Sequence, residues 1–261
     1  MKKLSPLSET TQAIIYGSVL GDGSLKIHPP YINARFSFRH SIVQKEYFLW
    51  KVNQLRQISS DKAVWQQGTN SKPDGWGTIK FRYQSQALPQ LTEMYNLIHP
   101  HKKFQIRRKW LNKMSALSLA VWWQDDGSII ANGRKGVLCT DSFKPEEVKL
   151  LQQYLLKVWK IQVTASPVTK AKPDRLRLWF RSTEQLQQFL RIILPYIKVE
   201  SMLPKCILLY HNLQLQQRWI SEIAKLTNFP ISVIDKAYQA KKGKWKTYAN
   251  KILENDIVQS L

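Results

Sequence analysis

Two aspartates stand in matching positions of the sequence, and each follows an apolar segment and precedes a glycine. Residues 15–23 read IYGSVLGDG, with Asp22 in the eighth position, and residues 119–127 read LAVWWQDDG, with Asp126 in the eighth position. A carboxylate among so many apolar side chains is costly to bury unless a cation compensates its charge. Two such segments therefore suggest that Asp22 and Asp126 share a cation.

The residue types around the two aspartates indicate which cation this would be. Carboxylate oxygens are hard ligands that favour Mg²⁺, and no histidine or cysteine adjoins either aspartate in the sequence. Magnesium held between two carboxylates and a phosphodiester would polarise the phosphoryl oxygen, activate water and stabilise the leaving oxyanion. The alternative is that each Asp-Gly pair only makes a turn, which is the usual role of a single pair. Two copies in matching contexts favour the metal site.

The elements that follow each aspartate also occur twice, which predicts two halves with the same fold. Residues 41–58 and 142–161 carry apolar side chains at spacings of three and four, which is typical of amphipathic helices. Residues 31–39, 79–83, 137–141 and 176–180 alternate apolar with polar side chains, as half-buried strands do. Each half therefore reads as helix, strand pair, helix, hairpin, helix, and the expected fold class is α+β with an antiparallel sheet in each half.

Small residues on the first apolar segment predict that the two motif helices pack closely. Gly17, Ser18 and Gly21 would let the second helix approach the first. If the two helices pack side by side about a pseudo-twofold axis, Asp22 and Asp126 meet beneath the sheets.

The net charge indicates a polyanionic partner. The 261 residues include 40 Lys and Arg against 18 Asp and Glu, which gives a net charge of +22 and a pI near 10.0. Such a field attracts phosphates, and the binding weakens steeply as salt rises. Charge alone leaves an anionic membrane or a ribosomal surface open. The basic and hydrogen-bonding open face expected on each sheet favours a DNA duplex, because a β-ribbon fits the major groove.

The composition excludes several classes of protein. With 43% hydrophobic residues, 10 Gly and 12 Pro, the chain is neither disordered nor collagen-like. No apolar run reaches the roughly 18 residues of a membrane span, and the N-terminus lacks a secretory apolar stretch. Cys139 and Cys206 show no zinc-type spacing. We expect an intracellular protein in a reducing compartment, either the cytoplasm or an organelle lumen. The start at Met1 and the absence of a terminal His-Asn pair disfavour an intein.

The two motif segments and the elements between them resemble the LAGLIDADG homing endonucleases, in the single-chain branch with two motifs. The resemblance extends over about residues 12–206 and includes SLAVWWQDDG at 118–127 and VLCTDSFKPEEV at 137–148. The sequence departs from the nine-letter pattern at Leu20 and Gln124, in the sixth position, and at Val121, where a small residue is common. These changes concern helix packing more than chemistry, and both acids are retained.

The resemblance implies two pseudo-symmetric αββαββα halves that form a saddle-shaped pair of antiparallel sheets. The first half is expected at residues 1–101 and the second at 115–206, with a basic linker at 102–114 between them. Residues 207–261 have no repeat partner and are expected to form a helical C-terminal extension, with helices over 207–226 and 231–253.

The resemblance also implies the residues of the catalytic site. Asp22 and Asp126 would bind Mg²⁺, with Mn²⁺ as a substitute, and the backbone carbonyls of Gly21 and Asp125 would face the metal. Basic residues near the metal would assist the phosphate, and the motif alignment gives these as Lys103 and Lys205.

The expected function is a monomeric, site-specific endonuclease of intron homing, which cuts both strands of a long asymmetric DNA target. Base-reading side chains are expected on the open faces of the two sheets, at Arg35, Ser37, Arg39, Lys80, Arg82 and Gln84 in the first and at Gln162, Thr164, Arg175, Arg177 and Arg181 in the second. Two alternatives remain open, namely a maturase that binds intron RNA and a cleavage-inactive regulator that binds DNA.

Overall fold

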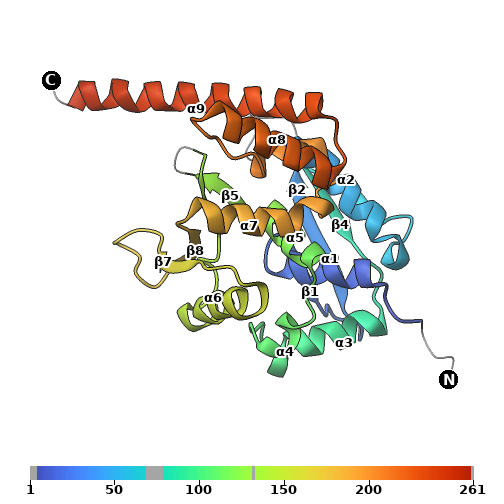
Figure 1. The fold of residues 1–261 in the computed structure, drawn as a ribbon. Coiled ribbons are helices and arrows are strands. Elements are labelled where there is room, and N and C mark those ends of the chain that lie inside the picture. The colour runs from blue at the N-terminus through green and yellow to red at the C-terminus, as the bar shows by residue number, and fades with distance from the viewer. Residues whose placement is uncertain (1–4, 69–78, 131–132, 260–261) are drawn as a thin grey trace.

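Two four-stranded antiparallel sheets with helices packed around them make up the fold (Figure 1). The computed structural model of the chain describes residues 5–68, 79–130 and 133–259. The strand order is β1-β2-β4-β3 in the first sheet and β5-β6-β8-β7 in the second. The same order in both sheets confirms the predicted repeat and the α+β fold class.

The first half runs from α1 to α3 in the predicted order of helices and strands. Its elements are α1 (Glu9–Val19), β1 (Gly23–Lys26), β2 (Arg35–Ser41), α2 (Lys45–Gln54), β3 (Val64–Gln67), β4 (Lys80–Gln84) and α3 (Pro89–Ile98). The predicted helix over 41–58 is divided, because the 3₁₀ turns η1 (Ile42–Gln44) and η2 (Arg56–Ile58) flank α2.

The second half repeats this order after a short connection. Its elements are α5 (Ala116–Asp126), β5 (Gly127–Ile130), β6 (Lys135–Leu138), α6 (Pro145–Trp159), β7 (Thr164–Pro167), β8 (Leu176–Phe180) and α7 (Thr183–Ile193). The strand predicted at 176–180 is confirmed residue for residue, whereas the one predicted at 137–141 is observed at β6.

The first sheet has one buried face and one open face, as the alternation predicts. On β2, Phe36 and Phe38 are buried, and the Phe38 ring lies 5.2 Å from the ring of Phe48 on α2. The intervening side chains face outward, so that Arg39 stands opposite Arg82 of β4. The hydrophobic face therefore packs against helices, and the polar face is left free for a partner.

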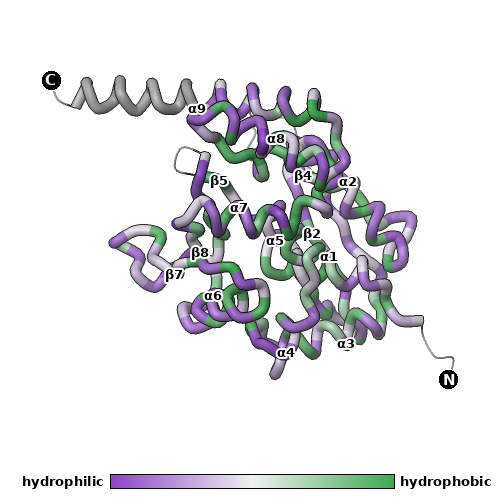
Figure 2. Tube along the Cα trace, in the orientation of Figure 1, coloured by the Kyte–Doolittle hydropathy of each residue, from purple (hydrophilic) through white to green (hydrophobic). Residues whose placement is uncertain are grey.

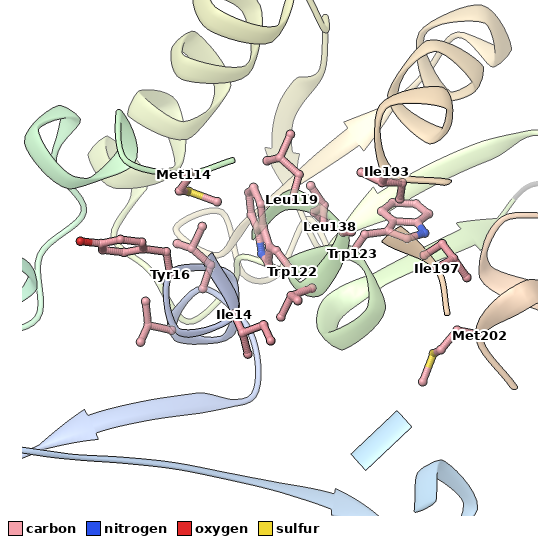
Figure 3. Packing of buried hydrophobic residues seen from close by; sticks show 14 of the residues in the cluster. Ile14, Tyr16, Met114, Leu119, Trp122, Trp123, Leu138, Ile193, Ile197 and Met202 are labelled. Atoms are coloured by element: carbon pink, nitrogen blue, oxygen red, sulfur yellow. The ribbon is translucent and has the colours of Figure 1, made fainter. Parts of the chain in front are cut away.

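The motif helices α1 and α5 pack against each other at the centre of the molecule. A Cβ atom on Gly17 would lie 2.3 Å from the carbonyl oxygen of Ser118, and one on Gly21 would lie 2.5 Å from Cβ of Asp125. Both glycines thus allow a contact that a side chain would block, which confirms the predicted close approach. Figure 3 shows the apolar side chains that surround this contact, with Trp122 and Trp123 of α5 among them. Figure 2 shows the apolar stretches of α1 and α5 in the middle of the molecule.

The basic segment between the halves is more than a connection. It includes the short helix α4 (Arg108–Leu111), in which Trp110 and Leu111 are buried. The Trp110 ring stacks on the ring of Tyr16 at a centroid distance of 6.1 Å. The predicted linker over 102–114 therefore contributes to the core of the first half.

The C-terminal extension consists of two helices, α8 (Leu213–Thr227) and α9 (Ile231–Gln259). The first begins six residues later than predicted, because the side chain of Asn212 caps it by accepting a hydrogen bond from the Leu215 N–H at 3.0 Å. The second continues through Gly243 and extends beyond the predicted end at residue 253. Among the described residues, no helix combines the length and apolar character needed to cross a bilayer.

Candidate metal and nucleic-acid site

The C-terminal ends of the two motif helices bring three carboxylates together. Asp22 lies in the turn between α1 and β1, whereas Asp125 and Asp126 form the last turn of α5. The Asp22 N–H donates a hydrogen bond to Oδ2 of Asp125 at 3.3 Å. Burial raises the pKa of Asp126 to about 7, and the charges of Asp22 and Asp125 add to the rise. The hydrogen bond between Asp22 and Asp125 therefore brings the ends of the two motif helices together.

Asp22 has positive partners that outweigh its burial. Burial alone raises the pKa of this carboxyl, but contact with His40 and the charges of Lys51 and Lys205 hold it below its usual value. Nδ1 of His40 lies 3.4 Å from Oδ2 of Asp22. The Asp22 side chain remains 41% exposed, so that part of the carboxylate is open to a ligand.

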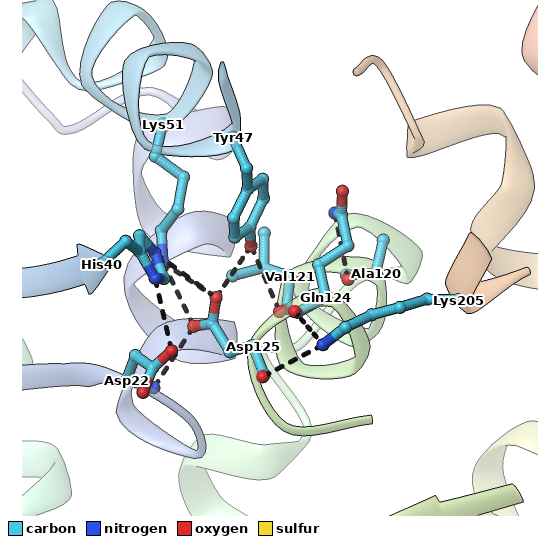
Figure 4. A network of polar contacts seen from close by, with 9 residues as sticks. All are labelled: Asp22, His40, Tyr47, Lys51, Ala120, Val121, Gln124, Asp125 and Lys205. Carbon is cyan, nitrogen blue, oxygen red and sulfur yellow. Dashed lines mark hydrogen bonds and ion pairs between the residues drawn. The ribbon is translucent and has the colours of Figure 1, made fainter. Parts of the chain in front are cut away.

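The Asp125 side chain turns away from solvent and into the first half (Figure 4). Its carboxylate accepts hydrogen bonds from the Tyr47 hydroxyl at 2.9 Å and from Nζ of Lys51 at 3.2 and 3.1 Å. Nε2 of His40 lies 3.8 Å from the same carboxylate. We call these four residues, His40, Tyr47, Lys51 and Asp125, the seam network.

Lys205 closes the other side of the site. It lies at the end of the 3₁₀ segment η5 (Glu200–Lys205), and its Nζ donates to the carbonyl oxygens of Gln124 at 2.5 Å and Asp125 at 3.3 Å. Burial lowers the pKa of Lys205, and the three nearby carboxylates oppose that shift. A cation at these carbonyls is favourable because they form the negative end of the α5 dipole.

Lys103 is exposed on the segment after α3. The first half also brings a lysine from α2 to this site, because Nζ of Lys51 lies 3.1 Å from Oδ2 of Asp125.

The residues of this site fit a hard divalent cation. Asp22 and Asp126 are both partly accessible, and the repulsion that raises the pKa of Asp126 is what a bound cation would relieve. The expectation that no histidine lies nearby is wrong, because β2 brings His40 to Asp22. One ligand atom each of Asp22, His40 and Asp125 lies within 4.8 Å of the others. The Asp125 end of that group already holds the Lys51 ammonium, which leaves Asp22 and Asp126 as the open pair.

A groove leads from Asp22 over the open face of the first sheet. Its volume is about 500 Å³, and four of the predicted DNA-contact residues line it, namely Ser37, Arg39, Arg82 and Gln84. The ladder pairs Ser37 with Gln84, Arg39 with Arg82 and Ser41 with Lys80, so these polar side chains form adjacent rows. Arg35 joins them through a 3.1 Å hydrogen bond from its Nη1 to Oε1 of Gln84.

The open face of the second sheet carries its arginines differently. Arg177 on β8 forms a two-pronged ion pair with Asp141, with Nε of Arg177 2.6 Å from Oδ1 and Nη2 3.3 Å from Oδ2. Arg181 lies over the Trp179 ring at 5.6 Å. Gln162, Thr164 and Arg175 are exposed, as predicted. The charge of Arg177 is thus partly compensated within the protein, whereas no ion pair of Arg82 is found among the described residues.

Three residues of the site, His40, Lys51 and Trp65, are not predicted from the sequence. His40 stands two residues after Phe38 on the inward side of β2, and Lys51 stands three residues after Phe48 on the buried side of α2. A histidine and a lysine on two apolar stripes are a signal for a buried polar network, because each needs a partner there. Trp65, which lines the groove beside Arg82, carries no such signal.

The family of the chain follows from a comparison with known sequences. The sequence model described as the LAGLIDADG DNA endonuclease family matches residues 12–186, which include both motif helices and most of both halves. The chain belongs to the LAGLIDADG DNA endonuclease family.

The chain is also similar to curated proteins and to a solved structure. The chain is 25% identical over 253 residues to the protein RecA of Mycobacterium gastri and 26% identical over 188 residues to that of Mycolicibacterium chitae. These matches cover 86% and 71% of this chain but only 56% and 38% of the relatives, so the chain spans about half of their length or less. The homing endonuclease I-WcaI, solved bound to its DNA recognition sequence, has the same fold. Its TM-score is 0.67 at 21% identity, with 80% of this chain and 91% of I-WcaI covered.

Proposed function

We propose that this chain is a site-specific, Mg²⁺-dependent endonuclease that cuts both strands of a DNA duplex. The observation that carries the proposal is the hydrogen bond from the Asp22 N–H to Asp125, which joins the ends of the two motif helices beside a groove lined by Asp22, Arg39 and Arg82. Family membership supports the reaction class. The net charge of +22 supports a polyanionic substrate.

The two motif aspartates are the proposed metal ligands. Asp22 and Asp126 would hold Mg²⁺ with help from the backbone carbonyls of Gly21 and Asp125, and Mn²⁺ would substitute. Once bound, the ion would polarise the scissile phosphate and lower the pKa of a water molecule. Nζ of Lys205 binds the carbonyl oxygens of Gln124 and Asp125 beside the acids, which supports its proposed role in stabilising the charge that develops on the phosphate.

The open faces of the two sheets are the proposed DNA contacts. In the first sheet, the rows that include Arg39, Arg82 and Gln84 extend from the groove at Asp22, so a duplex lying along them would reach the acids. Arginine and glutamine side chains are suited to reading base edges in the major groove. Because the two sheets carry different side chains, the proposed target is asymmetric.

The test begins with a library of randomised duplexes, because the target is unknown. The protein selects duplexes at low salt in Ca²⁺, and Mg²⁺ or Mn²⁺ is then added and the cut ends are sequenced. We expect wild-type protein to yield one preferred cut site. Asp22→Asn and Asp126→Asn should each lower the cleavage rate at least about 100-fold while retaining binding, since each removes a metal ligand.

Asp235→Asn is the matched control, because it removes the same charge from an exposed position on α9. Cleavage that survives both motif substitutions would show that other residues hold the metal. Sequence-specific binding without cutting in either metal would favour a DNA-binding regulator. Selection of structured intron RNA in preference to any duplex would favour a maturase.

A further inference from the structure

The two halves have the same order of helices and strands, but different polar side chains lie near Asp22 and near Asp126. Gly23, which follows Asp22, pairs with Phe38 of β2, and Gly127, which follows Asp126, pairs with Leu138 of β6. Phe38 and Leu138 therefore occupy corresponding positions, and residues of β6 correspond to residues of β2 one hundred positions earlier. The helices α2 and α6 keep this offset, since they begin at residues 45 and 145.

The residues of the seam network therefore have identifiable counterparts in the second half. His40 corresponds to Thr140, Tyr47 to Glu147 and Lys51 to Leu151. Thr140 donates a hydrogen bond to the Leu176 carbonyl, and Leu151 is an ordinary core residue with no exposed surface. Glu147 accepts the Ile106 N–H at 2.9 Å. None of the three reaches Asp126, because no hydrogen bond or ion pair is found for the Asp126 side chain among the described residues.

The two motif acids also differ in how the backbone holds them. Helix α1 ends at Val19, three residues before Asp22, whereas α5 continues through Asp126. The Asp126 carbonyl additionally accepts the Cys139 N–H at 3.1 Å. The backbone thus fixes Asp126 within a helix, while Asp22 lies in a turn and depends more on contacts of its side chain.

The seam network ends at Asp22. Lys51 and His40 have side chains with no exposed surface, and Nζ of Lys51 lies 3.5 Å from Nε2 of His40. If Nε2 accepts from the lysine, Nδ1 carries the proton, and it lies 3.4 Å from Oδ2 of Asp22. In the described part of the chain this buried nitrogen makes no hydrogen bond of good geometry, so the Asp22 carboxylate beside it is the group that could accept its proton.

We propose that the seam network is a positioning device that orients the Asp22 carboxylate for metal binding, through His40 held by Lys51 and Asp125, and that only the Asp22 half depends on it. The inference rests on the proposed endonuclease function. A ligating carboxylate that loses its supporting hydrogen bond commonly loses about 10- to 100-fold in metal affinity or activity. Damage to the network should therefore slow the cutting of one DNA strand more than that of the other.

The test compares two substitutions of His40. Phenylalanine keeps a ring among Phe38, Tyr47 and Phe48 but cannot donate to Asp22, whereas glutamine keeps a donor and an acceptor. The substrate is the duplex recovered from the library, with a different fluorophore on each strand, and single-turnover rates are measured for each strand across a Mg²⁺ titration. Calorimetric titration of the uncut complex with Ca²⁺ measures metal affinity independently of cleavage, and His40→Phe should weaken it. Thr140→Val is the matched control in the second half.

We expect His40→Phe to change the ratio of the two strand rates at least about tenfold from the wild-type ratio and to require more Mg²⁺ for the slowed strand. His40→Gln should restore most of the rate, and Thr140→Val should leave the ratio unchanged. Equal slowing of both strands by His40→Phe, or no slowing, would overturn the inference while leaving the endonuclease function intact. Failure of the wild-type protein to cut any duplex would overturn the proposed function instead.

Should His40→Phe fail to show a cooperative thermal transition, His40→Asn replaces it, because its shorter amide cannot span the distance to both Asp22 and Lys51. The comparison with His40→Gln then decides. An unchanged strand ratio in His40→Asn counts against the inference, and a ratio shifted as above supports it.

Discussion

The two halves of the molecule share their strand order, yet they place different side chains at the contact between α1 and α5. The seventh motif position is Gly21 in the first half and Asp125 in the second, and the carboxylate of Asp125 crosses the seam to reach Lys51. The opposite crossing is impossible, because Gly21 has no side chain. Pseudo-symmetry of a backbone therefore does not imply symmetry of its chemistry.

The buried pair of Asp125 and Lys51 holds the two halves in one arrangement. A buried charge pair rarely adds stability compared with well-packed apolar groups, but it penalises any arrangement that separates the partners. Asp125 and Lys51 come from different halves, so their pairing fixes how the two halves register at the metal site. At the position that corresponds to Lys51, the second half has Leu151, which is buried in its core.

The largest expected effect comes from breaking that pair. Lys51→Met leaves the Asp125 carboxylate buried without its cation and should lower the free energy of unfolding by about 3–5 kcal/mol. Leu151→Met, at the corresponding position, should cost less than about 1.5 kcal/mol because it preserves volume and polarity. Urea denaturation followed by tryptophan fluorescence measures both. Similar losses in the two variants would show that the halves do not differ in this respect.

A smaller effect is expected at the helix contact itself. A Cβ on Gly17 would lie 2.3 Å from the Ser118 carbonyl oxygen and 2.8 Å from Cβ of Val121, so Gly17→Ala should force α1 and α5 apart and cost about 1–3 kcal/mol. Gly243→Ala on α9 is the control, because its Cβ would meet nothing within 4 Å. There, the better helix propensity should raise local stability by about 0.5–1 kcal/mol. Thermal unfolding at matched protein concentration tests the pair, and a Gly17→Ala variant as stable as wild type would refute the close contact.

The smallest effect concerns the two DNA-facing arginines. Arg82→Gln should lower the slope of log K against log salt by about one unit if Arg82 binds a phosphate. Arg177→Gln should lower it less, because Asp141 already compensates Arg177. Asp141→Asn should steepen the slope, since it releases that charge. Fluorescence anisotropy with the selected duplex over a series of KCl concentrations gives all three slopes, and equal changes for the two arginines would contradict the distinction.

Much of the fold could be predicted because it depends on local pattern. The alternation on β2, the helix stripe with Phe48 and the repeated Asp-Gly pair each specify an element, and the repeat then specifies the arrangement. The boundary errors have local causes. The cap at Asn212, for example, delays α8 beyond the point at which apolar spacing suggests a start.

The site could be predicted only in part because its partners are distant in sequence. The motif identifies Asp22 and Asp126, and the small size of Gly17 and Gly21 indicates the close contact that brings them together. The partners of Asp125 lie 74 residues away at Lys51 and 78 at Tyr47, and no spacing rule connects them. Lys103, which the motif alignment also indicates, stays a prediction, and it is exposed on the segment after α3.

The C-terminal helix α9 is fastened to the same short segment that carries Lys205. The buried Lys241 of α9 donates hydrogen bonds to the carbonyl oxygens of Pro204 and Ile207, both at 2.6 Å, on either side of the Lys205–Cys206 step. This tail has no equivalent in the first half, yet it holds the peptide that places Lys205 at the carbonyl end of α5. Truncation of α9 would consequently displace the Lys205 side chain from that helix end, far from the place where the chain was shortened.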